Sequence, residues 1–549
     1  MQGYLTKRKH FDNRLEALKA KRSILEPEWK DIVQYLAPDC GSFDDPTSDK
    51  QKKKDPYYKQ NINSLPAFYM KNLAAALVSN LTPGRLRWFR LNVDNESREE
   101  SIWLNEVSRI MYNLFNNASL YEHLYNAFLE SSLFGPSIIG MQYTPELVYD
   151  FVPATIGEFY LAEGKTGIVD TCYRRFAMTN IQLYDAFGDK VGKKILDALE
   201  RDDTETYHNV VHAVEPNPRY LKYWKNEFNK PYISVYYIED ERNDEEFLEY
   251  KGLSHFPYLI ARWDKVGDST YGNGIGRLIL GDVKSLQAYE RDLAKASKKK
   301  ISPPLKGSQE LKNAITNVSA DGITFTNDIN GLTPLYNVNY ETNDALNNLQ
   351  RIMQRLYSQT YNDLFYALLN KDKTMSATEA GAIEQEKLTM LGSVTERLQN
   401  EFLKPLIVGG FMIAYENNVL PEPPQSIVGK ELTIRYQSLL AMAQELGDLS
   451  NVERYLQFIT SAGSINPTAL KKPDMLAISN FYAERLGLDL SLTKSDEQVE
   501  AELQAEQAAQ QEMQQQQLGL EQLTAGAQAA KDYAQAGTVS GNALDELMQ

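Results

Sequence analysis

The sequence predicts an α+β protein that is mainly helical, and three observations support this prediction. Apolar residues recur with a helical period of about 3.6 in the first 135 residues and again after residue 278. Between these regions, residues 137–264 change to short alternating runs, which are typical of antiparallel strands. A chain of 549 residues is too long for a single hydrophobic core, so we expect three or four structural units.

The first half of the chain is expected to be helical and then to form a sheet. Helices are predicted at residues 12–36, 62–81, 99–117 and 121–134. Strands are predicted at residues 138–143, 159–161, 168–176, 208–214, 233–238 and 258–263, with a helical insert near 180–199. Because short turns separate the strand candidates, we expect the sheet to be mostly antiparallel.

Two long helices follow, at residues 278–301 and 344–369. Consecutive prolines stop the first one, since proline cannot donate the backbone hydrogen bond that a continuing helix needs. The turn-rich segment between the helices holds strand candidates at residues 323–326 and 335–338. At ~1.5 Å per residue each helix spans roughly 35–40 Å, so the small β module is carried far from the main body.

A short basic loop at residues 371–375 leads into an exceptionally long helical pattern. Ser376 and Glu379 form a capping box at its start, where the hydroxyl accepts a helical N–H and the carboxylate reaches back to the cap. Pro405 interrupts the apolar pattern without ending it, which predicts a kink. A helix of roughly forty residues would be about 60 Å long, which favours a component of an assembly over a pocket enzyme.

The last two segments are a smaller helical region at residues 421–493 and a low-complexity tail at 494–549. The tail holds ten acidic residues and two lysines, and its alanine, glutamine and glutamate residues favour helix. Its apolar residues, such as Val499 and Met513, are too sparse for a monomeric core. Either neighbours in an oligomer bury them or the tail is disordered.

Composition excludes several classes of protein. The net charge of −16 argues against a protein that grips nucleic acid over its whole surface, but not against one that DNA slides past. The two cysteines, Cys40 and Cys172, are too few for a disulfide framework and favour a reducing compartment. The N-terminus lacks the apolar core of a signal peptide, and the longest apolar run is half a membrane span. We therefore expect a non-membrane protein that is made in the cytosol.

No candidate catalytic or metal site emerges from the sequence, and no cofactor is expected. The glycine-rich run Gly272–Gly276 precedes a helix but fits neither dinucleotide-binding nor P-loop patterns, so an entry turn is the favoured interpretation. His208 and His212 lie about 13 Å apart if they share a strand, which is too far for one metal ion.

Basic residues are the more informative candidates. Lys284, Arg291, Lys295 and Lys298 are spaced to share one face of the first long helix. They either touch passing phosphates or pair with an acidic neighbouring helix, and ordinary surface lysines are the alternative. Lys371, Lys373 and Thr374 in the short loop invite the same two interpretations.

Several short motifs are specific when taken in order. They are residues 80–91 (Asn-Leu-Thr-Pro-Gly-Arg-Leu-Arg-Trp-Phe-Arg-Leu), 281–286 (Gly-Asp-Val-Lys-Ser-Leu), 300–305 (Lys-Ile-Ser-Pro-Pro-Leu), the capping box with Glu386-Lys387, Leu391-Gly392, 396–399 and 432–444. Through them the chain, from about residue 10 to 460, resembles the portal (head-to-tail connecting) proteins of short-tailed double-stranded DNA bacteriophages.

The resemblance implies a ring subunit with named parts. These are a wing (1–277), a stem helix (278–303), a small β-containing clip (304–341), a second stem helix (342–370), a tunnel loop (371–375), a kinked wing helix (376–420), a helical crown (421–493) and a candidate helical barrel (494–549). Lys371, Lys373 and Thr374 would then line the DNA channel, with the four basic residues of the first stem helix as a weaker set.

The resemblance also implies a structural, non-enzymatic function and a set of partners. Similar proteins form rings, usually dodecamers, at one capsid vertex of the virion, and are assembled in the host cytoplasm. Double-stranded DNA enters and leaves through the ring; the partners are the terminase large subunit, tail adaptor and nozzle proteins, and capsid and scaffolding proteins. Two alternatives remain: another head-tail adaptor or tail-tube ring protein, and an enzyme that binds a nucleotide at Gly272–Gly276.

Overall fold

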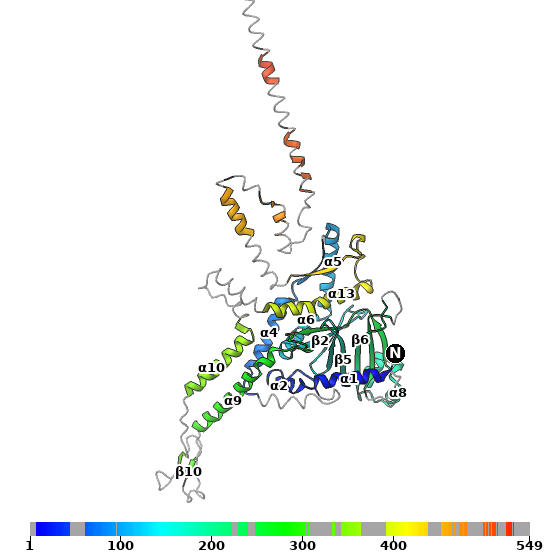
Figure 1. Cartoon of the computed structure of the whole chain (residues 1–549), viewed down its shortest axis with the longest axis vertical. Coiled ribbons are helices and arrows are strands. Elements are labelled where there is room, and N and C mark those ends of the chain that lie inside the picture. Colours follow the sequence, from blue (N-terminus) through cyan, green and yellow to red (C-terminus); the bar gives the residue numbers. More distant parts are fainter. Residues whose placement is uncertain are drawn as a thin grey trace, which may run out of the picture. The chain divides into compact units, whose positions relative to one another are not determined.

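A computed structural model describes residues 7–43, 61–94, 96–221, 229–239, 247–301, 305–307, 332–334, 342–363 and 391–437, with short pieces between 452 and 531. The chain divides into two compact units. The first comprises residues 1–94 and 103–441, and the second comprises residues 95–102 and 442–549. Nearly all the described elements belong to the first unit (Figure 1).

The N-terminal helices form close to where the sequence predicts them. They are α1 (Arg8–Arg22), α2 (Glu26–Leu36), α4 (Leu65–Leu81), α5 (Arg98–Asn117) and α6 (Leu120–Phe134). The single helix expected at residues 12–36 is instead two helices with a turn between them. Pro27 explains the break, because proline fits the first turn of a new helix but not the interior of a continuing one.

The β region is antiparallel, as predicted. Its strands are β2 (Pro136–Gln142), β3 (Asp150–Ala154), β4 (Phe159–Glu163), β5 (Val169–Thr179), β6 (Tyr207–Pro216), β7 (Tyr232–Ile238), β8 (Glu249–Leu253) and β9 (Tyr258–Arg262). They form a three-stranded sheet, β3-β2-β9, and a five-stranded sheet, β4-β5-β6-β7-β8. The predicted insert is α7 (Asn180–Phe187), a short 3-10 turn η2 (Gly188–Val191) and α8 (Lys193–Glu200). The short strands β3 and β8 were not predicted.

A two-stranded sheet joins distant parts of the chain. Strand β1 (Phe89–Val93) pairs antiparallel with β12 (Leu432–Tyr436), so that Leu91 lies opposite Ile434. The prediction of helix from residue 421 onward is therefore wrong at its start, because residues 432–436 complete this sheet. A 3-10 turn, η5 (Gln425–Ile427), precedes the strand.

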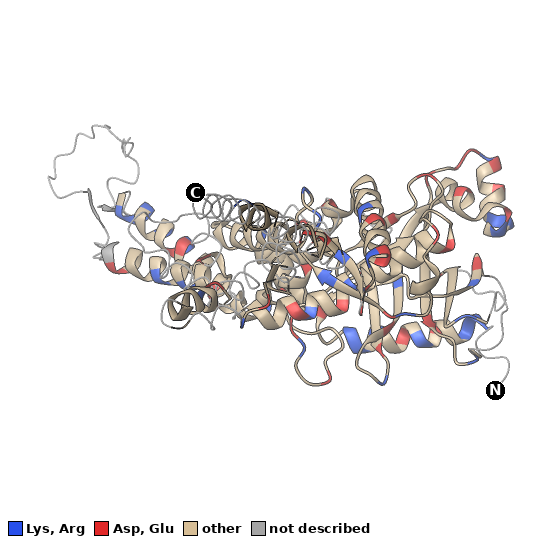
Figure 2. Ribbon diagram, turned by 90° about the horizontal axis from the view of Figure 1, so that it is seen from above, with Lys and Arg blue, Asp and Glu red and all other residues tan. Residues whose placement is uncertain are grey.

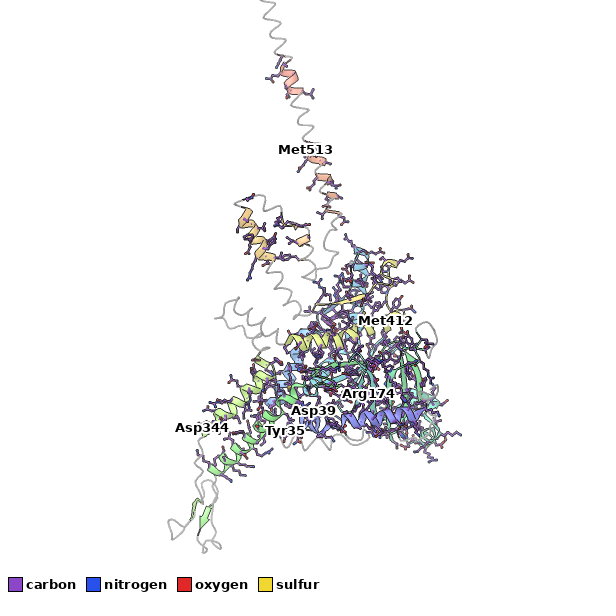
Figure 3. The ribbon with its side chains drawn as sticks, in the orientation of Figure 1. Tyr35, Asp39, Arg174, Asp344, Met412 and Met513 are labelled. Carbon is purple, nitrogen blue, oxygen red and sulfur yellow. The ribbon has the colours of Figure 1, made fainter. Side chains whose placement is uncertain are left out.

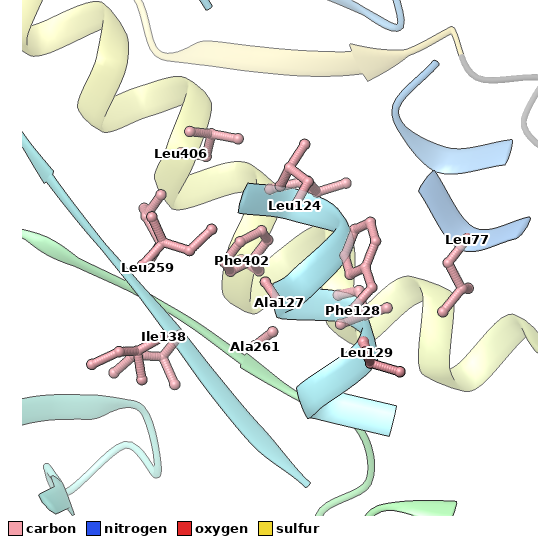
Figure 4. Packing of buried hydrophobic residues seen from close by; sticks show 14 of the residues in the cluster. Leu77, Leu124, Ala127, Phe128, Leu129, Ile138, Leu259, Ala261, Phe402 and Leu406 are labelled. Carbon is pink, nitrogen blue, oxygen red and sulfur yellow. The ribbon is translucent and has the colours of Figure 1, made fainter. Parts of the chain in front are cut away.

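Helix α6 lies at the centre of the main core. Leu124, Ala127 and Phe128 contact apolar residues from the three-stranded sheet on one side and Phe402 and Leu406 on another (Figure 4). Helix α1 instead covers the five-stranded sheet, where Phe11, Leu15 and Leu18 form a second cluster with residues of β4 to β7. Two buried arginines of α1 donate hydrogen bonds to backbone carbonyls of that sheet, Arg8 at the end of β7 and Arg22 at the start of β4.

Two long helices leave the core. Helix α9 (Ile275–Ile301) begins three residues before its predicted start. Helix α10 (Thr342–Gln359) is interrupted at residues 360 and 361, residues 362 and 363 are helical again, and residues 364–369 of the predicted helix lie outside the described residues. The interruption has a local cause: the Thr360 hydroxyl bonds back to the Leu356 carbonyl, and Tyr361 adopts a positive φ of 56°. Within the segment that joins them, β10 (Leu305–Gly307) pairs antiparallel with β11 (Leu332–Pro334). The predicted strands at 323–326 and 335–338 lie outside the described residues.

The long helical pattern is described from residue 391. Residues 391–398 are α-helical, then a π turn, η4 (Gln399–Leu403), leads into α13 (Lys404–Glu416). The helix therefore continues past Pro405, as predicted, and the irregularity is a π turn just before the proline. The capping box at Ser376 and Glu379 lies outside the described residues.

In the second unit, residues 452–463 are helical, and further helical pieces lie between 475 and 531. Within these pieces, Met513 and Leu523 are 64% and 74% exposed. Those exposures agree with the prediction that the tail has no core of its own.

Candidate functional site

Helices α9 and α10 pack against each other as an antiparallel pair (Figure 1). Buried Val283 and Leu286 of α9 and buried Ile352 and Leu356 of α10 supply the contact. The Arg355 guanidinium of α10 lies 2.6 Å from an Asp282 carboxylate oxygen of α9. The pair has the expected form, with one helix leading away from the core and the other leading back.

The four predicted basic residues of α9 do not share one environment. The Lys284 ammonium lies 2.6 Å from an Asp31 carboxylate oxygen of α2 and 5.7 Å from the centre of the Tyr35 ring. This contact matches the expectation that the stripe pairs with a neighbouring helix. Arg291, Lys295 and Lys298 are exposed, and Lys295 lies 3.6 Å from Asp292 on its own helix. Of the four predicted residues, these three are therefore the exposed ones.

The exposed half of α9 is strongly basic at its end. Lys298, Lys299 and Lys300 occupy the last turn, where positive charge complements the partial negative charge of a helix C-terminus. Blue segments recur along this pair of helices in Figure 2. The predicted channel residues Lys371, Lys373 and Thr374 lie outside the described residues, so their position stays a prediction.

A buried arginine fastens the long helix to the sheet. Arg262, at the end of β9, is 1% exposed. Its Nε and Nη2 donate to the two Glu401 carboxylate oxygens at 2.7 and 2.9 Å, and its Nη1 donates to Glu163. The Lys265 ammonium contacts the same Glu163 carboxylate at 2.8 Å. Two-pronged pairing of this kind fixes orientation as well as distance.

The π turn is what brings Glu401 to this cluster. The Lys404 N–H donates to the Gln399 carbonyl, five residues back, in place of the usual four. In a regular α-helix the N–H of residue 405 would donate to the Glu401 carbonyl. Because Pro405 has no N–H, that hydrogen bond cannot form. Phe402 and Leu403 of the same turn are fully buried. The patterns in the sequence did not predict this site, although the single arginine in the apolar run Tyr258–Trp263 indicates a buried charge.

The glycine-rich run is explained by close packing of backbones. A Cβ on Gly274 would lie 2.5 Å from the Leu133 carbonyl group at the end of α6, and one on Gly276 would lie 2.4 Å from the Leu133 oxygen. Gly272 has a positive φ of 71°, which an L side chain rarely adopts. This geometry supports the predicted entry turn and gives the glycines a role without a phosphate.

The other candidates for chemistry are occupied within the fold. His212 is buried and accepts or donates a hydrogen bond at each ring nitrogen, to Tyr258 at 2.5 Å and to Ser234 at 2.9 Å. Burial raises the pKa of the Cys172 thiol well above its usual range, which keeps the reactive thiolate form rare. Among the described residues, no cluster of His, Cys, Asp and Glu is suited to a metal ion. The described helices also include none that is long and apolar enough to cross a membrane.

Comparisons with known proteins agree over nearly the whole chain. The family model described as bacteriophage head to tail connecting protein matches residues 8–493. A portal protein of Salmonella phage epsilon15 is 31% identical over 505 residues, which cover 90% of this chain and 90% of that relative. A probable portal protein of Bordetella phage BPP-1 is also 31% identical, across 99% of this chain and 98% of the relative.

Proposed function

The chain belongs to the bacteriophage head to tail connecting protein family and functions as a portal protein, and we propose that twelve copies form a ring at one capsid vertex. In this proposal double-stranded DNA passes through the ring during packaging and again during ejection. The proposal assigns the protein a structural function in the virion and no catalytic step. The sequence match over residues 8–493 is the observation that carries it.

The geometry of α9 and α10 supports different functions for different parts of the subunit. An outgoing and a returning helix carry a small β module on the segment between them. We propose that this segment, residues 304–341, contacts the terminase large subunit during packaging and tail adaptor and nozzle proteins afterwards. The wing, residues 1–277, and the crown, residues 421–493, would contact capsid and scaffolding proteins during assembly in the host cytoplasm.

We propose that DNA meets two sets of side chains in the channel. The first set is the tunnel loop, with Lys371, Lys373 and Thr374. The second is the exposed part of the α9 stripe, with Arg291, Lys295 and Lys298. Lys284 is a weaker candidate for contact with DNA than the sequence alone indicates, because its ammonium group already pairs with the Asp31 carboxylate. A few cations on a chain of net charge −16 would guide a moving duplex without holding it.

The assignment is tested by electron microscopy of the purified protein in negative stain, with native mass determination on the same sample. We expect rings of about twelve copies with a central hole wider than a DNA duplex, which is ~20 Å across. A protein that stays monomeric at every concentration would contradict the proposal.

The channel residues need a separate test in phage particles. The double variant Lys371→Gln/Lys373→Gln should form normal rings but package or retain less DNA, because two positive charges per subunit are lost at the channel. The measurement is the DNA content of purified particles. A matched control is Lys193→Gln and Lys194→Gln on α8 of the wing, which removes the same charge elsewhere. If the loop variant fails to form rings, its lysines belong to the assembly surface and not to the channel.

A further inference from the structure

A cavity of about 390 Å³ lies in the wing, between the two sheets. Residues of β2 and β3, of β5 to β8 and of β9 line it, together with the end of α7. Arg174 of β5, which is labelled in Figure 3, is one of its lining residues. None of its lining residues belongs to α9 or α10, so the basic stripe of α9 does not account for it.

One wall of the cavity is a rigid aromatic surface. The rings of His212 and Tyr236 stack with centres 3.9 Å apart and planes 5° from parallel. The Phe187 ring lies 5.4 Å from Tyr236. Both nitrogens of His212 are engaged with hydroxyl groups, so its ring is held in place. A fixed stack of this kind offers a flat apolar face to another ring at little entropic cost.

Two cations share the same space. Arg174 and Lys251 both line the cavity, and Glu249, the one carboxylate among the lining residues, lies 3.0 Å from the Lys251 ammonium. The lining therefore carries one positive charge more than it carries negative ones. The pKa of His212 is held well below its ordinary value, first by burial and then by the positive charges of Lys251 and Arg174. Both cations therefore act on the aromatic wall, and an anion placed there would be attracted.

Arg174 has a donor that the fold leaves unused. Its Nη2 donates to the Pro153 carbonyl at 3.0 Å, and the nearest Glu158 carboxylate oxygen is 3.7 Å from it. Its Nε is buried, and no atom of the described residues accepts its hydrogen bond. A buried guanidinium donor without an acceptor favours a carboxylate as its partner, because charge-assisted hydrogen bonds are stronger than neutral ones.

The size and chemistry of the cavity exclude other occupants. A duplex is too wide for a volume of about 390 Å³, and a metal ion would need more than the one carboxylate present. The volume suits a short piece of polypeptide: an aromatic side chain and an acidic group beside it. On a chain with a net charge of −16, a cavity lined by two cations and one carboxylate is a local excess of positive charge that an acidic partner segment would recognise.

We propose that this cavity binds a partner polypeptide through an aromatic side chain next to a carboxylate. The ring would lie on the His212–Tyr236 stack, and the carboxylate would accept from Arg174 and pair with Lys251. The carboxylate has two possible sources, a C-terminal aromatic residue or an acidic side chain beside an aromatic one. The proposal is independent of ring formation, because one subunit supplies the whole cavity.

The test uses small probes and saturation-transfer NMR on the full-length protein. N-acetylphenylalanine carries the terminal carboxylate, N-acetyl-glutamyl-phenylalanine amide carries the internal one, and N-acetylphenylalanine amide carries neither. We expect one of the two charged probes to bind in the millimolar range and the neutral probe to bind at least tenfold more weakly. The charged probe that binds identifies the source. Equal signals from all three probes, or none from either charged probe, would overturn the proposal.

Three variants locate the binding. Lys251→Gln and Arg174→Gln should each weaken the charged probe at least tenfold, and Ala186→Trp should block the cavity from an exposed position at its edge. Lys193→Gln, which removes an exposed lysine of α8, is the matched control and should bind normally. Thermal unfolding of each variant shows whether it is folded, and the Lys251 side chain is 48% exposed, so its loss leaves the fold intact. If both single variants, Ala186→Trp and Lys251→Gln, bind the charged probe normally, the probe binds elsewhere and the assignment to this cavity is overturned.

Discussion

At the scale of single residues, Arg262 is the side chain whose loss should matter most for stability. It is 1% exposed, and it compensates the charges of Glu163 and Glu401. Removing one member of a buried ionic cluster leaves its partners uncompensated, which costs about 3–5 kcal/mol. We expect Arg262→Met to lower the free energy of unfolding by that amount, measured by urea unfolding at a fixed subunit concentration.

A matched arginine provides the control for this prediction. Arg277 pairs with Glu28 at 3.0 Å, but its side chain is 51% exposed. Exposed ion pairs contribute about 0–1 kcal/mol, so Arg277→Gln should change the unfolding free energy by less than 1 kcal/mol. Adding Glu401→Gln to Arg262→Met should recover part of the loss. Equal effects of the two arginine variants would show that the cluster does not stabilise the fold.

His212 should make stability depend on pH. Its pKa is lowered in the folded protein, mainly by burial, whereas the unfolded chain has an ordinary histidine pKa of about 6.5. Below pH ~6.5 the unfolded state binds a proton that the folded state does not, so stability falls as the pH falls. One such group contributes a slope of up to about 1.4 kcal/mol per pH unit.

The measurement compares urea unfolding of the native protein and of His212→Phe between pH 7.5 and 5.5. The variant keeps a ring beside Tyr236 but cannot gain the proton, so its stability should change less over this range. The variant loses two hydrogen bonds, which lowers its stability at every pH and leaves the slope as the informative quantity. Identical slopes would mean that His212 titrates normally in the folded protein.

At the scale of elements, two glycines of α9 should respond to alanine in opposite directions. A Cβ on Gly276 would lie 2.4 Å from the Leu133 oxygen, whereas one on Gly281 would meet nothing within 4 Å. Gly276→Ala must separate α9 from α6 and should cost about 1–3 kcal/mol. Gly281→Ala should stabilise by about 0.5–1 kcal/mol, because alanine favours the helix more than glycine does. Thermal unfolding distinguishes the two, and a neutral Gly276→Ala would show that the helix start can shift.

The elements also show what sequence can and cannot predict. Periodicity located α5, α6 and α9 within a few residues, since long amphipathic patterns depend on local spacing. Pairing of β1 with β12 could not be predicted, because its partners lie about 340 residues apart and neither strand has a long pattern. The end of α10 at Gln359 depends on Thr360 and Tyr361, whose conformation has no clear sequence signal.

The candidate site was only partly predictable for the same reason. Periodicity correctly placed Lys284, Arg291, Lys295 and Lys298 on one helix, α9. It could not predict that Asp31 of the neighbouring helix α2 pairs with Lys284 alone among these four. The lone Arg262 in an apolar strand indicated a buried charge, and only the fold reveals Glu401 as its partner. The cavity at Arg174 draws its lining from seven strands, so no single stretch of sequence could reveal it.

At the scale of the whole molecule, removing the tail (residues 494–549) would show whether the contacts between ring subunits involve it. The family model ends at residue 493, and the described tail residues are exposed, with Met513 at 64%. The tail also concentrates negative charge, with ten acidic residues against two lysines after residue 493. Several such tails side by side in a ring would repel each other at low ionic strength, which opposes assembly through this segment.

We therefore predict that a chain ending at residue 493 still forms rings with the same number of subunits. The free energy of association would come from the first unit, which holds nearly all the buried core. Native mass determination at low and high salt is the measurement, and the full-length protein is the control. The opposite result would be rings that form only with the tail and dissociate at low salt. That result would show that apolar tail residues of neighbouring subunits contact each other and stabilise the ring despite the repulsion between the tails.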